Sequence, residues 1–312
     1  MPLTSNLAGR SILAAALLPA LPLPSASQTA AAGTGALQAA PAPAATPAVR
    51  SPGNAEWAAS LSEARSRAAS EKKLVFVEFG QEGCGNCRRM DALLYPAFDF
   101  EALLVGMVPV KLELNSAEGQ ETARRYEVGE VPSILVVNPE GRLVFRMQGF
   151  QDAPGFYGHI RKDLESYRAF ARKIDAQDVG NLPAAEALAS GRHLFERRDP
   201  GAALPRLERA AAAPDATPAG RDSARELAAA AQLDLGKTAD SRKTIESLIS
   251  TTRDPDCRER AEIFRAQLPL AEGKPDEALR LFTAFRKAHP QSKYAAGVDQ
   301  VIQRLEAAGK TK

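Results

Sequence analysis

Two cysteines three residues apart are the most reactive feature of this chain. Cys84 and Cys87 lie in residues 74–88, LVFVEFGQEGCGNCR, where an apolar run leads into a Cys-Gly-Asn-Cys turn and then a polar segment. Such a pair can close a small disulfide. If the second cysteine opens a helix, the first lies near the helix N-terminus, where backbone N–H groups and the helix dipole favour a thiolate. The pattern therefore predicts thiol–disulfide exchange.

A Cys-x-x-Cys pair is also half of a common zinc site, which requires about four nitrogen or sulfur ligands. The chain offers one further cysteine, Cys257, and three histidines that are distant in sequence, His159, His193 and His289. We therefore expect no metal and no bound cofactor. Cys257 lies in a predicted turn between helical units and is expected to be a lone thiol.

The cysteine pair follows a run typical of a strand buried on both faces, Leu74–Phe79. Glu78 interrupts this run, and a buried carboxylate is costly unless it is paired or protonated. Before the strand, apolar residues at helical spacing predict a helix over Glu56–Ser70, with Trp57 as its anchor on the sheet. The further elements expected are strands at Met107–Leu114, Ile134–Val137 and Leu143–Gln148, a Pro/Gly turn at Asn138–Gly141 and a helix at Ala153–Lys173.

The order of these parts resembles the thioredoxin superfamily over roughly Glu56–Ala171. That family has a strand with a buried acid, a Cys-x-x-Cys turn, a helix, a second strand, and later a strand preceded by a cis-proline facing the cysteines. The matching positions here are the redox pair Cys84 and Cys87, the acid Glu78, a nearby lysine, Lys111, the cis-proline Pro132 with Ser133 after it, and the family glycine Gly149.

The resemblance implies an α/β thioredoxin-like domain, a central mixed sheet flanked by helices, over residues 55–175. Cys84 would be the attacking nucleophile and Cys87 the resolving thiol. Glu78, with Lys111 near it, would accept or donate the proton of Cys87. The alternative for the last two residues is a buried ion pair without a catalytic role.

Substrate binding is expected at Val131, Pro132, Ser133 and Gly83. A cis X-Pro bond costs only about 0.5–1 kcal/mol. It would turn the Val131 backbone so that its N–H and C=O face an extended substrate. Gly83 stands where thioredoxins carry Trp, so one lip of the substrate groove differs.

The residues between the cysteines, Gly85 and Asn86, lack the His of strong oxidases and the Pro of efficient reductases. The resemblance therefore implies an intermediate reduction potential, and we favour reductase or exchange activity. Asn86 is a good N-cap residue and is predicted to cap a helix that opens at Cys87.

Residues 180–312 are rich in Ala, Leu, Arg and Glu with helical periodicity. Similar residues recur at intervals of 38 and 37, in four sets: Phe195, Leu233 and Leu270; Arg198, Gly236 and Gly273; Ala203, Ser241 and Ala278; Leu207, Ile245 and Phe282. The last unit resembles a tetratricopeptide repeat. We predict an all-α domain of helical hairpins that binds a protein partner, or alternatively one that only packs against the first domain.

The N-terminal residues 1–28 have Arg10 ahead of an apolar run, Ser11–Leu23, and then small residues, as in a secretory signal peptide. The alternative is a disordered Ala-rich tail. Residues 29–54 are almost all Ala, Pro, Gly, Thr and Ser, which predicts a flexible linker. The protein is therefore expected to be exported, to the periplasm or another extracytoplasmic space.

The net charge of +2 is too close to zero to favour nucleic acid as a partner. The sequence thus predicts an exported thiol–disulfide oxidoreductase that acts on protein disulfides or thiols, receives electrons from a membrane donor and carries a partner-binding helical domain. The competing hypothesis is a non-catalytic assembly protein that uses the thioredoxin fold and the repeats as a binding platform.

Overall fold

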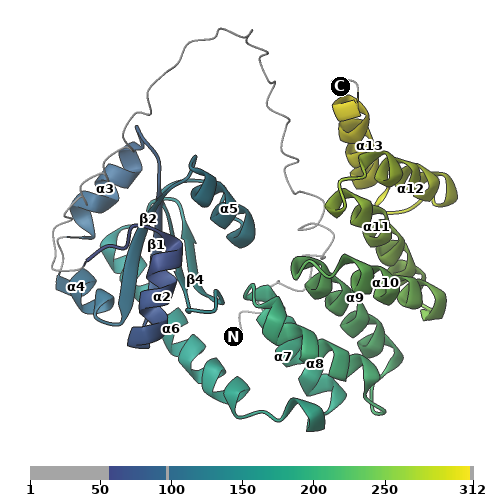
Figure 1. The fold of residues 1–312 in the computed structure, drawn as a ribbon, viewed down its shortest axis with the longest axis horizontal. Helices are drawn as coiled ribbons and strands as arrows, with labels where there is room; N and C mark the ends of the chain where they lie inside the picture. The colour runs from purple at the N-terminus through teal and green to yellow at the C-terminus, as the bar shows by residue number, and fades with distance from the viewer. Residues whose placement is uncertain (1–55, 96–97, 310–312) are drawn as a thin grey trace, which may run out of the picture.

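The computed structural model describes residues 56–95 and 98–309. It contains a sheet with helices on both faces, which we call the sheet domain, followed by an all-helical part, which we call the helical region (Figure 1). A long helix, α6 (Ala153–Asp175), begins in the sheet domain and leads toward the helical region. The predicted signal peptide, residues 1–28, and the predicted linker, residues 29–54, lie outside the described residues.

The sheet has four strands in the order β2-β1-β3-β4. Their bounds are Leu74–Gly80 for β1, Met107–Glu113 for β2, Ser133–Val137 for β3 and Leu143–Gln148 for β4. β1 pairs with β2 in parallel, while the β1–β3 and β3–β4 pairs are antiparallel. The mixed sheet expected from the sequence is therefore confirmed, and β1, which carries the run toward the cysteines, is a central strand.

Two hydrophobic clusters cover the two faces of the sheet, because alternate strand residues point to opposite sides. On one face, Phe76 and Ile134 pack with residues of α3 (Gly85–Leu93), α4 (Phe98–Leu104) and α6. On the other face, Val75 and Val77 pack with residues of α2 (Leu61–Glu71) and α5 (Ala117–Tyr126). Glu78 has the parity of Phe76, so it belongs to the face that α3 covers.

The first helix begins later than the sequence suggested. Ser60 caps α2, its hydroxyl accepting the Glu63 N–H at 3.1 Å, so residues 56–60 precede the helix. Ala58 instead forms a parallel bridge to Val110 of β2. Trp57 still packs against the core, with its ring 6.3 Å from that of Phe76.

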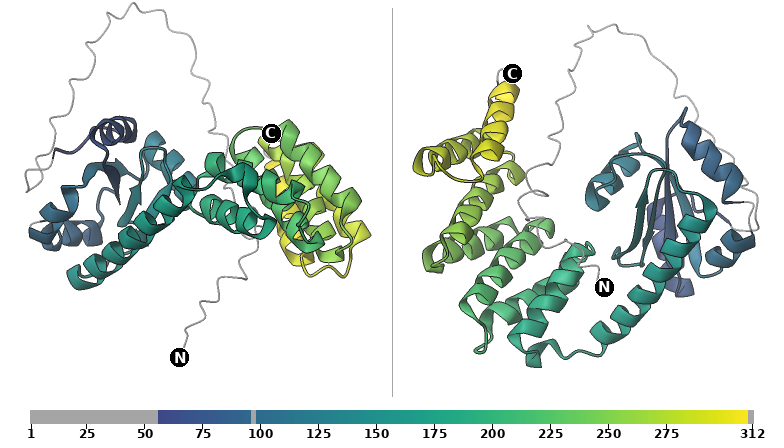
Figure 2. Two further views of the ribbon diagram at one scale, coloured as in Figure 1. Left: turned by 90° about the horizontal axis from the view of Figure 1, so that it is seen from below. Right: turned by 180° about the vertical axis from the view of Figure 1, so that it is seen from behind.

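The helical region is a succession of antiparallel helices that stack one after another (Figure 2). After a short 3₁₀ turn, η1 (Val179–Asn181), the helices are α7 (Ala184–Glu196), α8 (Pro200–Ala212), α9 (Pro218–Asp234), α10 (Thr238–Thr251), α11 (Pro255–Ala271), α12 (Pro275–Ala288) and α13 (Ala295–Gly309). These helices are consistent with the predicted helical repeats.

The recurring residues occupy equivalent places in successive hairpins. The small residues Ala203, Ser241 and Ala278 and the larger residues Leu207, Ile245 and Phe282 all have 0% exposure. The recurring turn residues Arg198, Gly236 and Gly273 all have positive φ, between 61° and 73°. The repeat pattern in the sequence therefore corresponds to repeated packing and repeated turn geometry.

The turn between α7 and α8, residues 197–199, docks on the free edge of the sheet. The Leu143 N–H donates to the Arg197 carbonyl at 2.7 Å, and the Arg197 guanidinium donates to the carbonyls of Leu143 and Val144 at 3.0 and 3.1 Å. Arg142, before β4, pairs with Asp199 at 2.8 Å, both side chains being largely buried. β4 is an edge strand, which would expose unpaired backbone N–H and C=O groups. The turn at residues 197–199 covers these groups at the start of β4.

No helix in the described ranges, 56–95 and 98–309, is long and apolar enough to cross a membrane.

Phe282 and Phe98 provide a matched test of the packing of the helical region. Phe282→Ala should lower the free energy of unfolding by about 3–5 kcal/mol, because it leaves a cavity at a fully buried site. Phe98→Ala, at a site 82% exposed on α4, should change it by less than about 0.5 kcal/mol. Urea denaturation followed by circular dichroism measures both, and equal effects would contradict the assigned packing.

Candidate functional site

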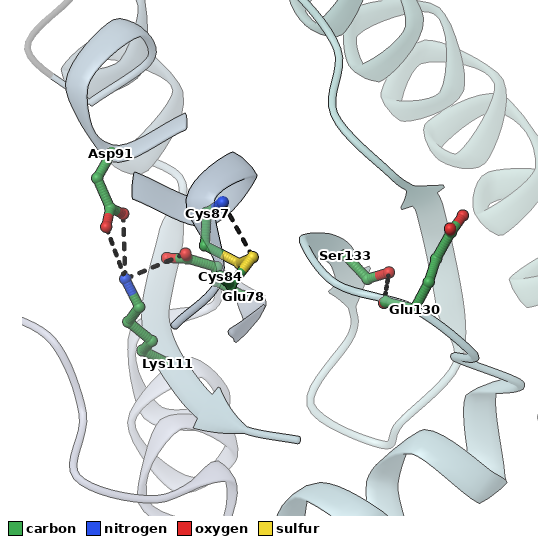
Figure 3. The surroundings of a disulfide bond; sticks show 7 residues. All are labelled: Glu78, Cys84, Cys87, Asp91, Lys111, Glu130 and Ser133. Atoms are coloured by element: carbon green, nitrogen blue, oxygen red, sulfur yellow. Dashed lines mark hydrogen bonds and ion pairs between the residues drawn. A yellow bond between two sulfur atoms is a disulfide. The ribbon is translucent and has the colours of Figure 1, made fainter. Parts of the chain in front are cut away.

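Cys84 and Cys87 form a disulfide at the start of α3, with their Cα atoms 5.3 Å apart (Figure 3). Cys84 is the N-cap of this helix, and its sulfur accepts the Cys87 N–H at 3.1 Å. Asn86 therefore does not cap the helix as the sequence suggested; the helix begins one residue after Cys84, and Asn86 is an exposed residue of its first turn.

The two sulfurs differ in access. Cys84 is partly exposed, whereas Cys87 is 5% exposed and packs against the core. An incoming thiol or disulfide can thus reach Cys84 and is kept from Cys87 by the surrounding residues. This asymmetry matches the nucleophile and resolving-thiol positions that the sequence resemblance implies.

Gly83 lies in the loop that carries β1 into the disulfide. Its φ of 79° is in the region that favours glycine, and an added Cβ would meet no atom within 4 Å. The surface beside it is an open polar hollow lined by Gln81, Glu82, Gly83, Glu113 and Asn115. Gly83 thus serves the backbone turn, and the space where a side chain would stand is open.

Glu78 lies behind the disulfide as a fully buried carboxylate. The parallel register of β1 and β2 places Lys111 opposite it, and Lys111 Nζ lies 3.1 Å from Glu78 Oε1. The same ammonium donates to both carboxylate oxygens of Asp91 on α3, at 3.0 and 3.3 Å (Figure 3). One lysine therefore bridges a fully buried and a partly exposed carboxylate.

Asp91 and Tyr95 are the members of this cluster that the sequence reasoning missed. Asp91 follows Cys87 by four residues, so helical spacing alone puts it on the same side of α3. Tyr95, just after α3, has a buried hydroxyl. Burial, and then the Glu78 carboxylate, raise the pKa of Tyr95 well above its ordinary value.

Burial raises the pKa of Glu78 above its ordinary value, and the charge of Lys111 offsets only part of this effect. For Lys111, burial alone would lower the pKa, but Glu78 and then Asp91 raise it. Lys111 thus stays charged while Glu78 is easier to protonate than a free carboxylic acid. A carboxyl group poised in this way can exchange a proton with a neighbouring thiol.

The segment around Pro132 was predicted to face the disulfide and to contain a cis peptide bond. The Val131–Pro132 peptide bond is cis. Val131 is partly exposed, and neither its N–H nor its C=O has a hydrogen-bond partner within the described part of the chain. These two groups are free to pair with an extended peptide.

Ser133, which the sequence predicted to bind substrate, is the first residue of β3. Its side chain is fully buried, and its hydroxyl donates to the Glu130 carbonyl at 2.6 Å (Figure 3). It therefore fixes the loop before β3 and does not present its hydroxyl to a substrate. Pro132 is buried as well, with its carbonyl accepting the Gly149 N–H at 2.9 Å.

Cys257 is a buried free thiol in the first turn of α11, within the core of the helical region, and not in a turn as the sequence suggested. Burial raises its pKa. Among residues 56–95 and 98–309, no group of three or more His, Cys, Asp or Glu side chains is arranged to hold a metal ion.

A family model described as a thioredoxin-like domain matches residues 61–162, which include the cysteine pair, Glu78, Lys111 and Pro132. The sheet domain is a thioredoxin-like domain. The match covers the strands and the first part of α6, and it leaves the helical region outside.

Two curated relatives match the thioredoxin-like domain. Thiol:disulfide interchange protein DsbD 2 of Pseudomonas aeruginosa is 31% identical over 111 residues, 34% of this chain and 19% of the relative. A protein disulfide-isomerase of Datisca glomerata is 25% identical over 118 residues, 36% of this chain and 22% of the relative. The chain thus spans about a fifth of the length of these relatives. Among solved structures, a thioredoxin from Thermus thermophilus is 28% identical, covering 35% of this chain and 85% of its own, with a TM-score of 0.32.

Glu78→Gln tests whether the buried carboxylate titrates as described. Because the folded protein raises the pKa of Glu78 above its unfolded value near 4.5, the folded state binds the proton more tightly. The free energy of unfolding of the wild type should therefore fall as pH rises through the window between these two values. Each unit of pKa shift corresponds to about 1.4 kcal/mol of this loss.

Glutamine has the same shape and no charge, so Glu78→Gln should remove the fall and exceed the wild type in stability above that window. Urea unfolding of the oxidised protein at a series of pH values measures this effect. The control is Glu101→Gln, at an exposed position of α4, which should follow the wild-type curve. Parallel pH curves for wild type and Glu78→Gln would contradict the assignment.

Proposed function

We propose that this protein is an exported thiol–disulfide oxidoreductase that exchanges disulfides with protein substrates through Cys84 and Cys87, acting as a reductase or in exchange. The observation that carries the proposal is the unequal access of the two sulfurs at the start of α3, with the Glu78 carboxylate behind them. The two relatives are named as a thiol:disulfide interchange protein and a protein disulfide-isomerase, which supports the same chemistry.

The reduction of a substrate takes two sulfur displacements. The Cys84 thiolate attacks one sulfur of the substrate disulfide, which breaks that S–S bond, forms a mixed disulfide and releases the first substrate thiolate. The Cys87 thiolate then attacks the Cys84 sulfur, which forms the Cys84–Cys87 disulfide and releases the second. Two electrons pass from the cysteine pair to the substrate.

Glu78 would take the proton of Cys87 as that thiol becomes a nucleophile, and would return it when the pair is reduced again. Its raised pKa suits this task, because a group that exchanges protons near neutral pH works best with a pKa closer to that range. Lys111 holds the carboxylate in place and balances its charge when it is ionised.

Substrate would lie across Cys84 as an extended peptide. The unpaired N–H and C=O of Val131 can add it to the structure as a short strand, as in other strand-addition complexes. Gly83 leaves the opposite side open, which suits substrates with a bulky residue next to the cysteine.

Export and the electron source belong to the same proposal. The layout of residues 1–28 supports secretion. A reduced cysteine pair outside the cytoplasm needs electrons from elsewhere, and a membrane protein thiol donor would supply them by the reverse of the two displacements.

The helical region would bind a protein partner. Helical hairpins stacked in this way leave an extended concave surface suited to protein segments. Within the described residues, the hydrogen bonds and ion pairs to the strands of the sheet come from the turn at residues 197–199. At the end of α9, Asp234 interacts electrostatically with Arg198, Arg125 and Glu127, so this helix lies near the sheet domain. The later hairpin helices, from α10 onward, are the part that we propose binds a partner.

Cys87→Ala should trap substrates as mixed disulfides on Cys84, because the resolving thiol is missing. Affinity capture from fractionated cells, under alkylating conditions and with a reducing and a non-reducing gel, measures the trapped species. Cys84→Ala is the matched control and should trap nothing. Complexes in the extracytoplasmic fraction would support export as well. An empty Cys87→Ala trap would overturn the enzymatic proposal in favour of a non-catalytic binding platform.

The reduction potential of the pair decides the direction of transfer. We expect a value nearer to about −270 mV, typical of a reductant, than to about −120 mV, typical of a strong oxidant. Equilibration with glutathione or dithiothreitol buffers, followed by alkylation and mass measurement, gives the potential. A value at the oxidising end would reverse the direction proposed here while leaving the chemistry of the pair unchanged.

A further inference from the structure

Arg198 differs from its counterparts in the other hairpins. The turns of the second and third hairpins place Gly236 and Gly273 at this position, with φ of 73° and 71°. Arg198 adopts a φ of 61°, a conformation that is unfavourable for a residue with a side chain. The other two turns use glycine at this position, where the conformation costs little. An arginine in the same conformation therefore indicates a function for its side chain.

The Arg198 guanidinium forms an ion pair with the Glu127 carboxylate of the thioredoxin-like domain. Glu127 is the C-cap of α5, also at positive φ, and it receives Arg146 of β4 as a second partner at 3.4 Å. Burial alone would raise the pKa of Glu127, but Arg198 and then Arg146 hold it below its ordinary value. This carboxylate thus stays ionised between two arginines from different elements.

Glu127 begins the loop of residues 127–132, which ends at Val131 and Pro132. Arg146 also donates to the Tyr126 carbonyl at 2.8 Å, so the start of the loop is held from two sides. Further along, the Gly129 N–H donates to the Gln148 side chain at 2.9 Å. The helical region therefore contacts the start of the segment whose far end carries the free backbone groups of Val131.

Docking of the two parts does not explain this contact. Arg197 and Asp199, on either side of Arg198, already bind the backbone of β4 and Arg142. Arg198 alone among the three turn residues reaches α5 and the loop. Its ion pair adds a constraint on the loop that the other two residues do not supply.

We propose that Arg198 is a positioning residue: through Glu127 it fixes the 127–132 loop so that the Val131 backbone is held ready for an extended peptide substrate. The inference rests on the proposed function, because it assigns the helical region a part in substrate binding at that same site. A small disulfide that does not pair with Val131 gains nothing from this constraint.

Arg198→Gly is the decisive variant, because glycine is the residue that the other two turns use. It relieves the backbone conformation while removing the guanidinium, so the variant should fold and unfold as the wild type does or be more stable. For the pre-reduced full-length protein, the half-saturation concentration for a peptide disulfide should rise by about three- to fivefold, the effect of losing one partly exposed ion pair.

The rate with hydroxyethyl disulfide and the reduction potential should not change. Arg198→Lys keeps the charge and should recover part of the loss, and Glu127→Gln should reproduce it. Arg242→Ala is the matched control, because it breaks a similarly exposed ion pair, to Glu272, that lies within the helical region. It should leave peptide binding as in the wild type.

The outcomes distinguish a failure of the proposed function from a failure of the role given to Arg198. If the wild type reduces neither disulfide, the proposed function is wrong and this inference falls with it. If the wild type is active and Arg198→Gly has the wild-type half-saturation concentration for the peptide, the inference alone is overturned. An equal loss with the peptide and with hydroxyethyl disulfide would also overturn it, because that result means a general distortion of the site.

Discussion

The structure is arranged around one buried charge. Glu78 lies in the central strand β1 with none of its side chain exposed, and a carboxylate there is tolerated only with a partner or a proton. The parallel pairing of β1 with β2 supplies Lys111 directly opposite, and α3 adds Asp91 beyond it. A shift of one residue in that register would turn Lys111 to the other face and leave the carboxylate alone. The same carboxylate that constrains the fold also lies behind the disulfide, where the proposed function assigns it the exchange of the Cys87 proton.

The positions of the strands along the chain were predictable because each strand is marked by residues that lie close together in the sequence. Runs of β-branched residues, the Pro/Gly turn at Asn138–Gly141 and the acid-cysteine spacing are all read within a few residues, and β1 and β4 have the expected bounds to within one residue. The start of α2 was not predictable in the same way. The apolar residues from Trp57 onward have helical spacing, which predicted a helix from Glu56. Ser60 instead caps the helix, and Ala58 pairs with Val110 of β2, a tertiary contact that keeps these residues out of the helix.

The candidate site also combines features that could and could not be predicted. The resemblance to the thioredoxin superfamily indicated which residues to expect near Cys84, but the loop conformation decides which of their atoms face outward. Ser133 was predicted to bind substrate, and its side chain turns inward, where its hydroxyl donates to the Glu130 carbonyl, a bond that the sequence pattern does not show. Cys84 is the N-cap in place of Asn86, because α3 begins at Gly85, two residues before the predicted start at Cys87. Asp91 could have been found from its spacing to Cys87, whereas Tyr95 lies beyond the end of α3 and had no such signal.

Covering the edge of β4 also restricts how the two parts of the chain can move. The Arg197 guanidinium donates hydrogen bonds to two backbone carbonyls of β4. It also donates to the ring of His193, four residues earlier on α7, at 2.9 Å. Burial, and then the charges of Arg197 and Arg142, lower the pKa of His193, so the ring stays neutral and able to accept this hydrogen bond at neutral pH. A flexible tether between the two parts would leave any partner on the helical region free to take many positions relative to Cys84. A docked first hairpin instead limits the positions that such a partner can take relative to Cys84.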